Sequence, residues 1–347
     1  MLNITKLPAT KLAKGHFSAP KAPLAHALWL SMLPSDRLHV VVCDDQAEVA
    51  RLHTELAFFG VHAHLFVDWE TLPYERLSVH DDIVSERLEL LSNMPSTGIL
   101  LVSVASLMQR VAPPAWLLSA HFDIAIGQHF NLEQERERLV RAGYRAVDSV
   151  YSAGEFAVRG GIMDIFVMGQ ALPLRLELFD DEVESIRFFD SDSQRSLSDG
   201  ELAKRRGEPI GTLAYPDKVN VTAFRVLPAK EFPLHDKETF RQNFARLFPD
   251  VSHRKFDLYQ EVMNGITPNG IEYYQPLFFS ETHWQNSTLF HYLPSNSCFI
   301  VNDHLATTQD NAWQAICQRY DNYRFDKQNP ISVSYTHLRA HETSLHL

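Results

Sequence analysis

The chain has 347 residues, 45% apolar and 22% charged, which is typical of a soluble globular protein with two or three domains of about 100 to 150 residues. Its formal net charge of −11 argues against nucleic acid as the main partner, because phosphate binding requires concentrated Lys and Arg. No run of about 18 apolar residues predicts a membrane-spanning helix, and the N-terminal segment lacks the order of a secretory signal.

The cysteines bear on the cellular compartment. Cys43, Cys298 and Cys317 are an odd number at wide spacing, unlike a disulfide framework or a paired metal site. We therefore expect a cytoplasmic protein with reduced cysteines and no membrane partner.

The first region, residues 1–120, alternates buried strands with amphipathic helices, which predicts a parallel sheet with helices on its faces. In the stretch DDQAEVARLHTELAFFG, Val49, Leu52 and Leu56 form one apolar stripe and Gly60 provides a C-terminal stop. The predicted strands are 38–43, 62–66 and 98–104, and the predicted helices are 44–60 and 83–91.

The middle region, residues 121–200, differs in character from the first. After a strand at 122–127, Asn131 is placed to cap a helix that Gly143 ends. Strands joined by Gly, Pro and Asp turns follow, so the region is predicted to be a small α+β domain. It carries 15 acidic residues, eight Arg and no Lys, and so contributes −7 of the net charge of −11. The predicted strands are 144–150, 154–160, 161–168, 172–179 and 182–190.

The third region, residues 201–330, returns to the α/β style, as expected of one domain interrupted by another. Residues 197–211 are predicted to form a surface loop or linker, whose short basic run is interpreted as solvated. Residues 331–347 have no apolar periodicity; we interpret them as a non-native cloning tail and expect the native protein to be longer. The remaining predicted elements are strands at 219–228 and 297–302 and helices at 236–248 and 253–263.

The sequence lacks the motifs that would indicate an active site. It has no G-x-x-x-x-G-K-[ST] phosphate loop and no G-x-S-x-G turn, and residues 15–29, where a motor domain would carry the phosphate loop, contain prolines in place of glycines. His62 and His64 share one face of a predicted strand without a third ligand, and Asp81 and Asp82 are explained by their place at a helix start. We therefore expect no catalytic residue, metal or cofactor in this chain.

One strand carries an aromatic residue on a charged face. In RLELFDDEVESIRFFD, alternation places Arg175, Glu177 and Phe179 on one face and Leu176 and Leu178 on the other, which is the core face. A lone exposed aromatic residue commonly has no function, so the pattern by itself leaves the role of Phe179 open.

Two longer stretches carry a resemblance to a known family. Residues 68–91, DWETLPYERLSVHDDIVSERLELL, and residues 154–196, beginning GEFAVRGGIMDIF, closely resemble the N-terminal region of the bacterial transcription-repair coupling factors. The second stretch is also similar to the excision-repair protein UvrB, while GIEYYQPLFFSE at 270–281 supports the coupling factors. The segment 197–220 departs from the family pattern.

The resemblance implies a degenerate helicase-like α/β domain, interrupted by a small α+β domain that binds UvrA. It also implies that Arg159, Arg175 and Phe179 contact UvrA, an aromatic with nearby Arg being a usual composition of an interface hot spot. We add Glu177 on geometry alone, because it shares the predicted face. Arg159 has an alternative role, which is to neutralise Glu155 or Glu177.

For the whole family the resemblance implies parts that this chain lacks: a DNA translocase motor that uses ATP and Mg, a domain that contacts RNA polymerase, and a C-terminal domain that masks the UvrA-binding face. The expected function of the chain is therefore that of an adaptor that recruits UvrA to stalled RNA polymerase. Two alternatives stay open, which are vestigial nucleotide or DNA binding by the α/β domain and an autoinhibitory docking role.

Overall fold

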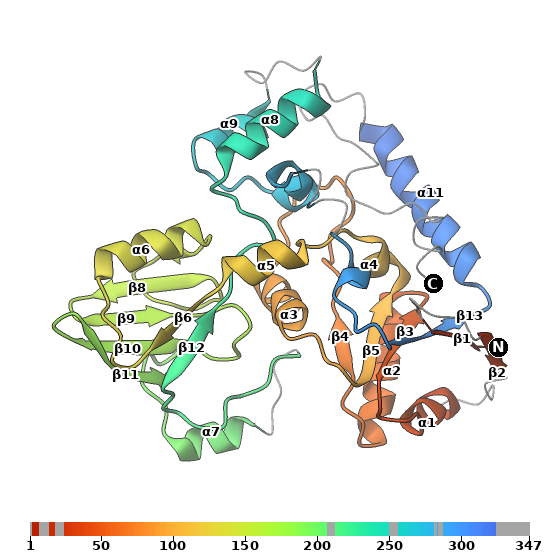
Figure 1. The fold of residues 1–347 in the computed structure, drawn as a ribbon, viewed down its shortest axis with the longest axis horizontal. Helices are drawn as coiled ribbons and strands as arrows, with labels where there is room; N and C mark the ends of the chain where they lie inside the picture. The colour runs from red at the N-terminus through yellow and green to blue at the C-terminus, as the bar shows by residue number, and fades with distance from the viewer. Residues whose placement is uncertain are drawn as a thin grey trace.

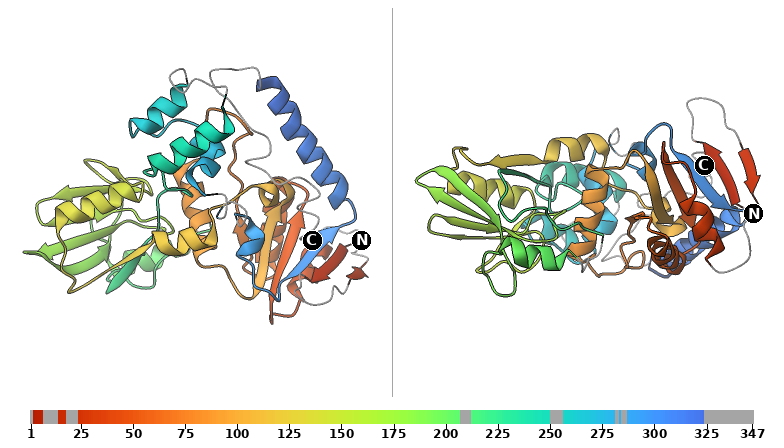
Figure 2. Two further views of the ribbon diagram at one scale, coloured as in Figure 1. Left: turned by 45° about the horizontal axis from the view of Figure 1, so that its top comes forward. Right: turned by 90° about the horizontal axis from the view of Figure 1, so that it is seen from below.

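The computed structural model describes residues 2–6, 14–17, 24–206, 212–249, 256–280, 283 and 287–323. The predicted tail, 331–347, lies outside the described residues, as does part of the predicted linker. Two large sheets lie at opposite ends of the molecule with helix α3 (Asp81–Ser92) between them (Figure 1), and Figure 2 shows the same separation in two further orientations. Among the described residues, no helix is long and apolar enough to cross a membrane.

The larger sheet has six strands in the order β2-β1-β13-β3-β5-β4. Its strands β13, β3, β5 and β4 run parallel, and β1 and β2 extend it as an antiparallel edge. The prediction of a parallel α/β sheet is thus confirmed, and β13 brings the third region into it beside β3. The strand bounds are β1 (Leu2–Lys6), β2 (Lys14–Phe17), β3 (Leu38–Cys43), β4 (His64–Phe66), β5 (Gly98–Ser103) and β13 (Cys298–Asn302).

Helices cover both faces of this sheet. The predicted stripe of Val49, Leu52 and Leu56 packs in one apolar cluster with Val41, while its neighbour Val40 packs in another cluster on the opposite face. Alternate residues of β3 thus face separate cores, which is why the whole strand is buried and all of its residues but His39 are apolar. The helices of this unit are α1 (Ala25–Ser31), α2 (Gln46–Phe58), α3, α4 (Val104–Met108) and α11 (Leu305–Tyr323).

The second sheet has five strands in the order β11-β10-β9-β8-β7, antiparallel except for the pair β7 and β8. Helix α6 (Leu132–Arg141) precedes it, and the predicted cap is confirmed because Asn131 Oδ1 accepts a hydrogen bond from the Gln134 amide at 3.1 Å. The strand predicted at 144–150 is wrong in length, since only its start pairs with β8. The strand bounds are β7 (Arg145–Ala146), β8 (Glu155–Arg159), β9 (Ile162–Ile165), β10 (Leu174–Phe179) and β11 (Glu182–Phe188).

The predicted loop at 197–211 contains a helix, α7 (Asp199–Arg205), so that prediction is wrong for these residues. Ser198 and Glu201 form a reciprocal capping box at its N-terminus, and Leu202 is buried. The capping residues were visible in the sequence as S-x-x-E, but the surrounding polar composition outweighed them.

The third region contributes to more than one unit. Its strand β12 (Ala223–Val226) pairs antiparallel with β6 (Phe122–Ala125) of the middle region. The boundaries at 120 and 200 stay predictions. A separate aromatic cluster joins the two predicted helices of the region to a 3₁₀ helix. These and the remaining helices are α5 (Pro114–Ala120), α8 (Lys237–Leu247), α9 (Asp257–Met263), η2 (Ile271–Phe278) and η3 (Leu289–His291).

Candidate protein-docking face

The five-stranded sheet has one face that packs into the main core and one that does not. Leu176 and Met163 are fully buried on the core face, where they share a cluster with Leu139 of α6. The other face, called the outer face below, is built from cross-strand partners that point the same way. Its residues are Ala157, Arg159, Ile162, Asp164, Arg175, Glu177, Phe179, Glu182, Ser185 and Arg187.

Phe179 is the most exposed apolar side chain of the outer face. It is 69% exposed, whereas Leu178 packs against the core and Leu176 is fully buried. The predicted alternation along β10 is therefore confirmed. The chain turns directly after Phe179, at Asp180 with φ 53°, as expected of an Asp-rich turn.

Arg175 is engaged within the chain rather than directed freely to solvent. Its Nε and Nη2 donate to the two carboxylate oxygens of Asp164 at 2.6 and 2.8 Å, and its Nη1 donates to the Gln194 carbonyl at 3.3 Å. The guanidinium lies 4.8 Å from the ring centre of Phe189, and the side chain is only 17% exposed. The hydrogen bonds to Asp164 raise the pKa of Arg175 and outweigh the effect of its burial. The bidentate geometry thus fixes Arg175 on the sheet.

Glu177 and Arg159 are more accessible. Glu177 forms an ion pair with Arg187 and accepts a hydrogen bond from Ser185 Oγ at 3.0 Å. Arg159 is exposed, and its Nη2 donates to the Asp148 carbonyl and to Ser149 Oγ, the latter at 2.7 Å.

The two carboxylates that the sequence offered as partners of Arg159 are engaged elsewhere. Glu155 pairs with Arg145 at 3.3 Å, and Glu177 pairs with Arg187. Among the residues that the structure describes, no carboxylate lies within ion-pair distance of Arg159. Its charge is therefore available to a partner.

Strand register brings the predicted residues together and adds one that was missed. Ile162 pairs with Arg159 on β8 and with Glu177 on β10, so it lies between two predicted contacts. The hairpins β8–β9 and β10–β11 end side by side, where the Leu178 amide donates to the Gly161 carbonyl at 2.8 Å. Alternation shows which face a residue occupies on its own strand but not which residue it meets on the next strand, so Ile162 could not be identified from sequence.

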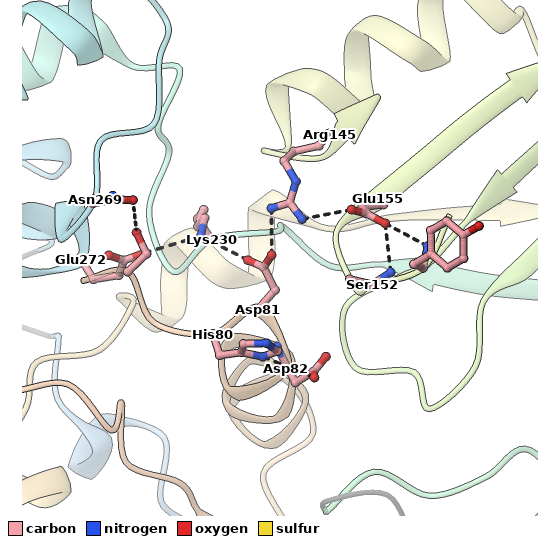
Figure 3. A network of polar contacts seen from close by, with 11 residues as sticks. His80, Asp81, Asp82, Arg145, Ser152, Glu155, Lys230, Asn269 and Glu272 are labelled. Atoms are coloured by element: carbon pink, nitrogen blue, oxygen red, sulfur yellow. Dashed lines mark hydrogen bonds and ion pairs between the residues drawn. The ribbon is translucent and has the colours of Figure 1, made fainter. Parts of the chain in front are cut away.

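A second polar cluster lies where the two sheet units meet. Asp81, in the first turn of α3, pairs with Arg145 at 2.8 Å and with Lys230 at 3.4 Å, and Lys230 also pairs with Glu272 at 3.5 Å (Figure 3). Burial raises the pKa of Glu272, although Lys230 acts in the opposite direction. The predicted helix-start role of Asp81 is thus combined with ion pairs that join α3, β7 and η2.

The chain, including the segment that forms the outer face, is similar to known proteins. Residues 122–204 match the family model of the UvrB interaction domain, a span that includes the whole outer face. The chain is 37% identical over 316 residues to the transcription-repair-coupling factor of Haemophilus influenzae, a match that covers 89% of this chain and 25% of that protein. The chain is a homologue of the transcription-repair-coupling factors. The Escherichia coli protein of that name is 38% identical over 298 residues, covering 84% of this chain and 24% of its own length.

These matches confirm the resemblance read from the two stretches of sequence, and they are consistent with the N-terminal region of a coupling factor. The chain spans about a quarter of the length of the curated relatives it matches. The matches cover whole segments and do not identify the residues that contact a partner. Arg159, Arg175, Glu177 and Phe179 stay predictions as contact residues.

Proposed function

We propose that this chain is the UvrA-recruiting adaptor of a transcription-repair-coupling factor, and that UvrA docks on the outer face of the five-stranded sheet. The observation that carries the proposal is the match of residues 122–204 to the UvrB interaction domain, together with the exposure of Phe179 on that part of the chain. The sheet supplies a rigid platform, so little conformational entropy is lost when a partner covers it.

The geometry supports a division of roles among the four predicted contacts. Phe179 is exposed and apolar, and fully burying such a side chain contributes about 1.5 to 3 kcal/mol. Arg159 and Glu177 lie on the same face at partly or fully exposed positions, where they favour the correct orientation of the partner. Arg175 acts mainly by holding Asp164 and the segment that carries Gln194 in place.

The six-stranded unit is proposed to be a degenerate helicase-like domain without a nucleotide site. The support is the parallel α/β sheet together with the missing phosphate loop. For the whole protein, a motor that uses ATP and Mg, contacts with RNA polymerase and DNA, and a C-terminal domain that covers the docking face belong to the same proposal. The cytoplasm is its proposed location.

Calorimetric titration of the chain into purified UvrA tests the adaptor role. We expect binding, and we expect Phe179→Ala to weaken it at least about thirtyfold, equivalent to about 2 kcal/mol. Phe58→Ala is the matched control, because Phe58 is 76% exposed but lies at the end of α2 on the other unit. Its affinity should equal that of the unchanged chain.

The possible results separate the parts of the proposal. If the unchanged chain does not bind UvrA, the adaptor role is rejected. If it binds and Phe179→Ala binds equally well, the docking face lies elsewhere. Stabilisation by millimolar ATP would favour the alternative of vestigial nucleotide binding, since a ligand at 100 times its Kd adds about 2.7 kcal/mol to the free energy of unfolding.

A further inference from the structure

We infer that Ile162 is a second apolar contact residue, which forms with Phe179 a two-residue apolar centre on the outer face. The inference rests on the proposed docking function and specifies the partner's chemistry. The partner surface must carry an apolar cavity wide enough for both side chains, with an acidic group facing Arg159.

Ile162 and Phe179 are diagonal neighbours on adjacent strands of the outer face. Ile162 lies in one cross-strand row with Arg159 and Glu177, and Phe179 is two residues beyond Glu177 on the same strand. Such diagonal neighbours are within reach of an aromatic side chain. Phe179 is itself 69% exposed, and its recorded cross-strand partner on β11 is the exposed Glu182.

Other apolar residues at one end of the outer face are covered from within the chain. Val150, Ala157 and Phe189 form a small buried cluster at the end of the sheet where Arg175 and Asp164 pair. Ile162 is not part of that cluster and is 36% exposed. The apolar surface that is left open is therefore concentrated at Ile162 and Phe179.

Charged side chains surround Ile162 and Phe179, among them Glu177, Arg159 and Glu182. Glu177 is neutralised by Arg187, whereas no carboxylate among the described residues pairs with Arg159. An apolar centre with a charged residue at its edge is the usual composition of a protein interface. Ile is also stiff at χ1, so fixing its side chain on binding costs little entropy.

The same hairpin offers a matched control. Val158 is also 36% exposed and also β-branched, but it pairs with Met163 on the core side of β9. Ile162→Ala and Val158→Ala therefore remove similar exposed area from opposite faces of one hairpin. A general effect on the hairpin would appear in both variants, and a docking effect only in the first.

The experiment measures the UvrA affinity of the full chain and of its variants by calorimetry, with thermal unfolding recorded for each. We expect Ile162→Ala to weaken binding about tenfold and Val158→Ala to change it less than about twofold. Ile162→Thr keeps the β-branched shape while placing a hydroxyl in the partner's cavity, and is expected to weaken binding at least as much as Ile162→Ala. This variant keeps the test valid if the Ala variant fails to fold.

The outcomes distinguish the inference from the function on which it rests. If Phe179→Ala loses affinity but Ile162→Ala and Ile162→Thr bind like Val158→Ala, the second contact is rejected and the docking role stands. If the unchanged chain does not bind, the docking role itself is rejected, and the inference with it. Binding that is independent of salt and of Arg159→Gln would reject the acidic group on the partner.

Discussion

The two large sheets of this protein differ in how their faces are covered. In the six-stranded sheet Val40 and Val41 are both buried, in separate clusters on opposite faces. In the five-stranded sheet Leu176 is buried while its neighbours Arg175 and Glu177 are only partly buried. A strand that is buried on both faces, such as β3, needs apolar residues at nearly every position, whereas the five-stranded sheet keeps polar groups on one face.

The two sheets also differ in what holds their side chains in place. The side chains of β3 in the six-stranded sheet are buried between helices on both faces. Those on the outer face of the second sheet are held by cross-strand ion pairs rather than by a layer of helices. Substitutions on the covered side should therefore affect folding, and those on the outer face should affect binding.

The largest effect is expected for the buried ion pair of Arg87 and Glu231. Arg87 on α3 is fully buried, donates to Glu231 Oε1 at 2.6 Å and lies 4.3 Å from the ring centre of Phe66. Glu231→Ala leaves a buried charge without its partner, so we expect it to lower the free energy of unfolding by about 3 to 5 kcal/mol, measured by denaturant titration. The double variant Arg87→Met with Glu231→Leu should regain much of this loss, and a single variant as stable as the unchanged chain would contradict the prediction.

A pH-dependent effect is expected at the junction between the units. Burial raises the folded-state pKa of Glu272 above its ordinary value of 4.5, against the attraction of Lys230 and with a smaller contribution from Asp81. A raised pKa means that the stability contributed by the protonated carboxyl is present below the unfolded pKa and is lost as pH rises through the folded pKa. Glu272→Gln removes this loss.

The free energy of unfolding of Glu272→Gln, relative to that of the unchanged chain, should therefore increase as pH is raised from about 4 towards 7. Denaturant titrations at several pH values measure the difference. Asp82→Asn is a suitable control, because Asp82 is exposed on the same network. A difference that shrinks as pH rises would show that the ion pair with Lys230 outweighs the burial.

The smallest effect is expected for the ion pair on the outer face. The side chains of Glu177 and Arg187 are 35% and 32% exposed, so water screens their attraction. Glu177→Gln should change the free energy of unfolding by less than about 1 kcal/mol, in contrast to Glu231→Ala. A loss comparable to that of the buried pair would mean that the outer face is structural, and would remove the distinction between the two sheets.

Much of the fold was predictable because the signals are local. Asn131 caps α6 and Gly143 follows its end in a left-handed conformation, with φ 92°, as the sequence indicated. The predicted strand at 144–150 was too long, because the length of β7 depends on how far β8 pairs with it. The helix α7 was missed although Ser198 and Glu201 carried its capping signal.

The candidate face was predictable in part. Alternation along one strand was sufficient to direct Phe179 outward and Leu176 inward, because successive side chains point to opposite faces of a sheet. The family resemblance then identified Arg159 and Arg175 as residues of interest. The engagement of Arg175 with Asp164 did not follow from either source, because the two residues lie on different strands.

The sequence by itself therefore determined most of the elements, the buried side of strand β10 and of helix α2, and the family resemblance, since these depend on periodicity, caps and ordered runs of residues. Only the tertiary structure decided that Ile162 lies between Arg159 and Glu177. It also decided that Arg175 is held by Asp164, and that Arg87 pairs with Glu231, which lies far along the chain. The physical reason is that strand register and the packing of units depend on which distant segments pair, and one strand's pattern is compatible with many partners.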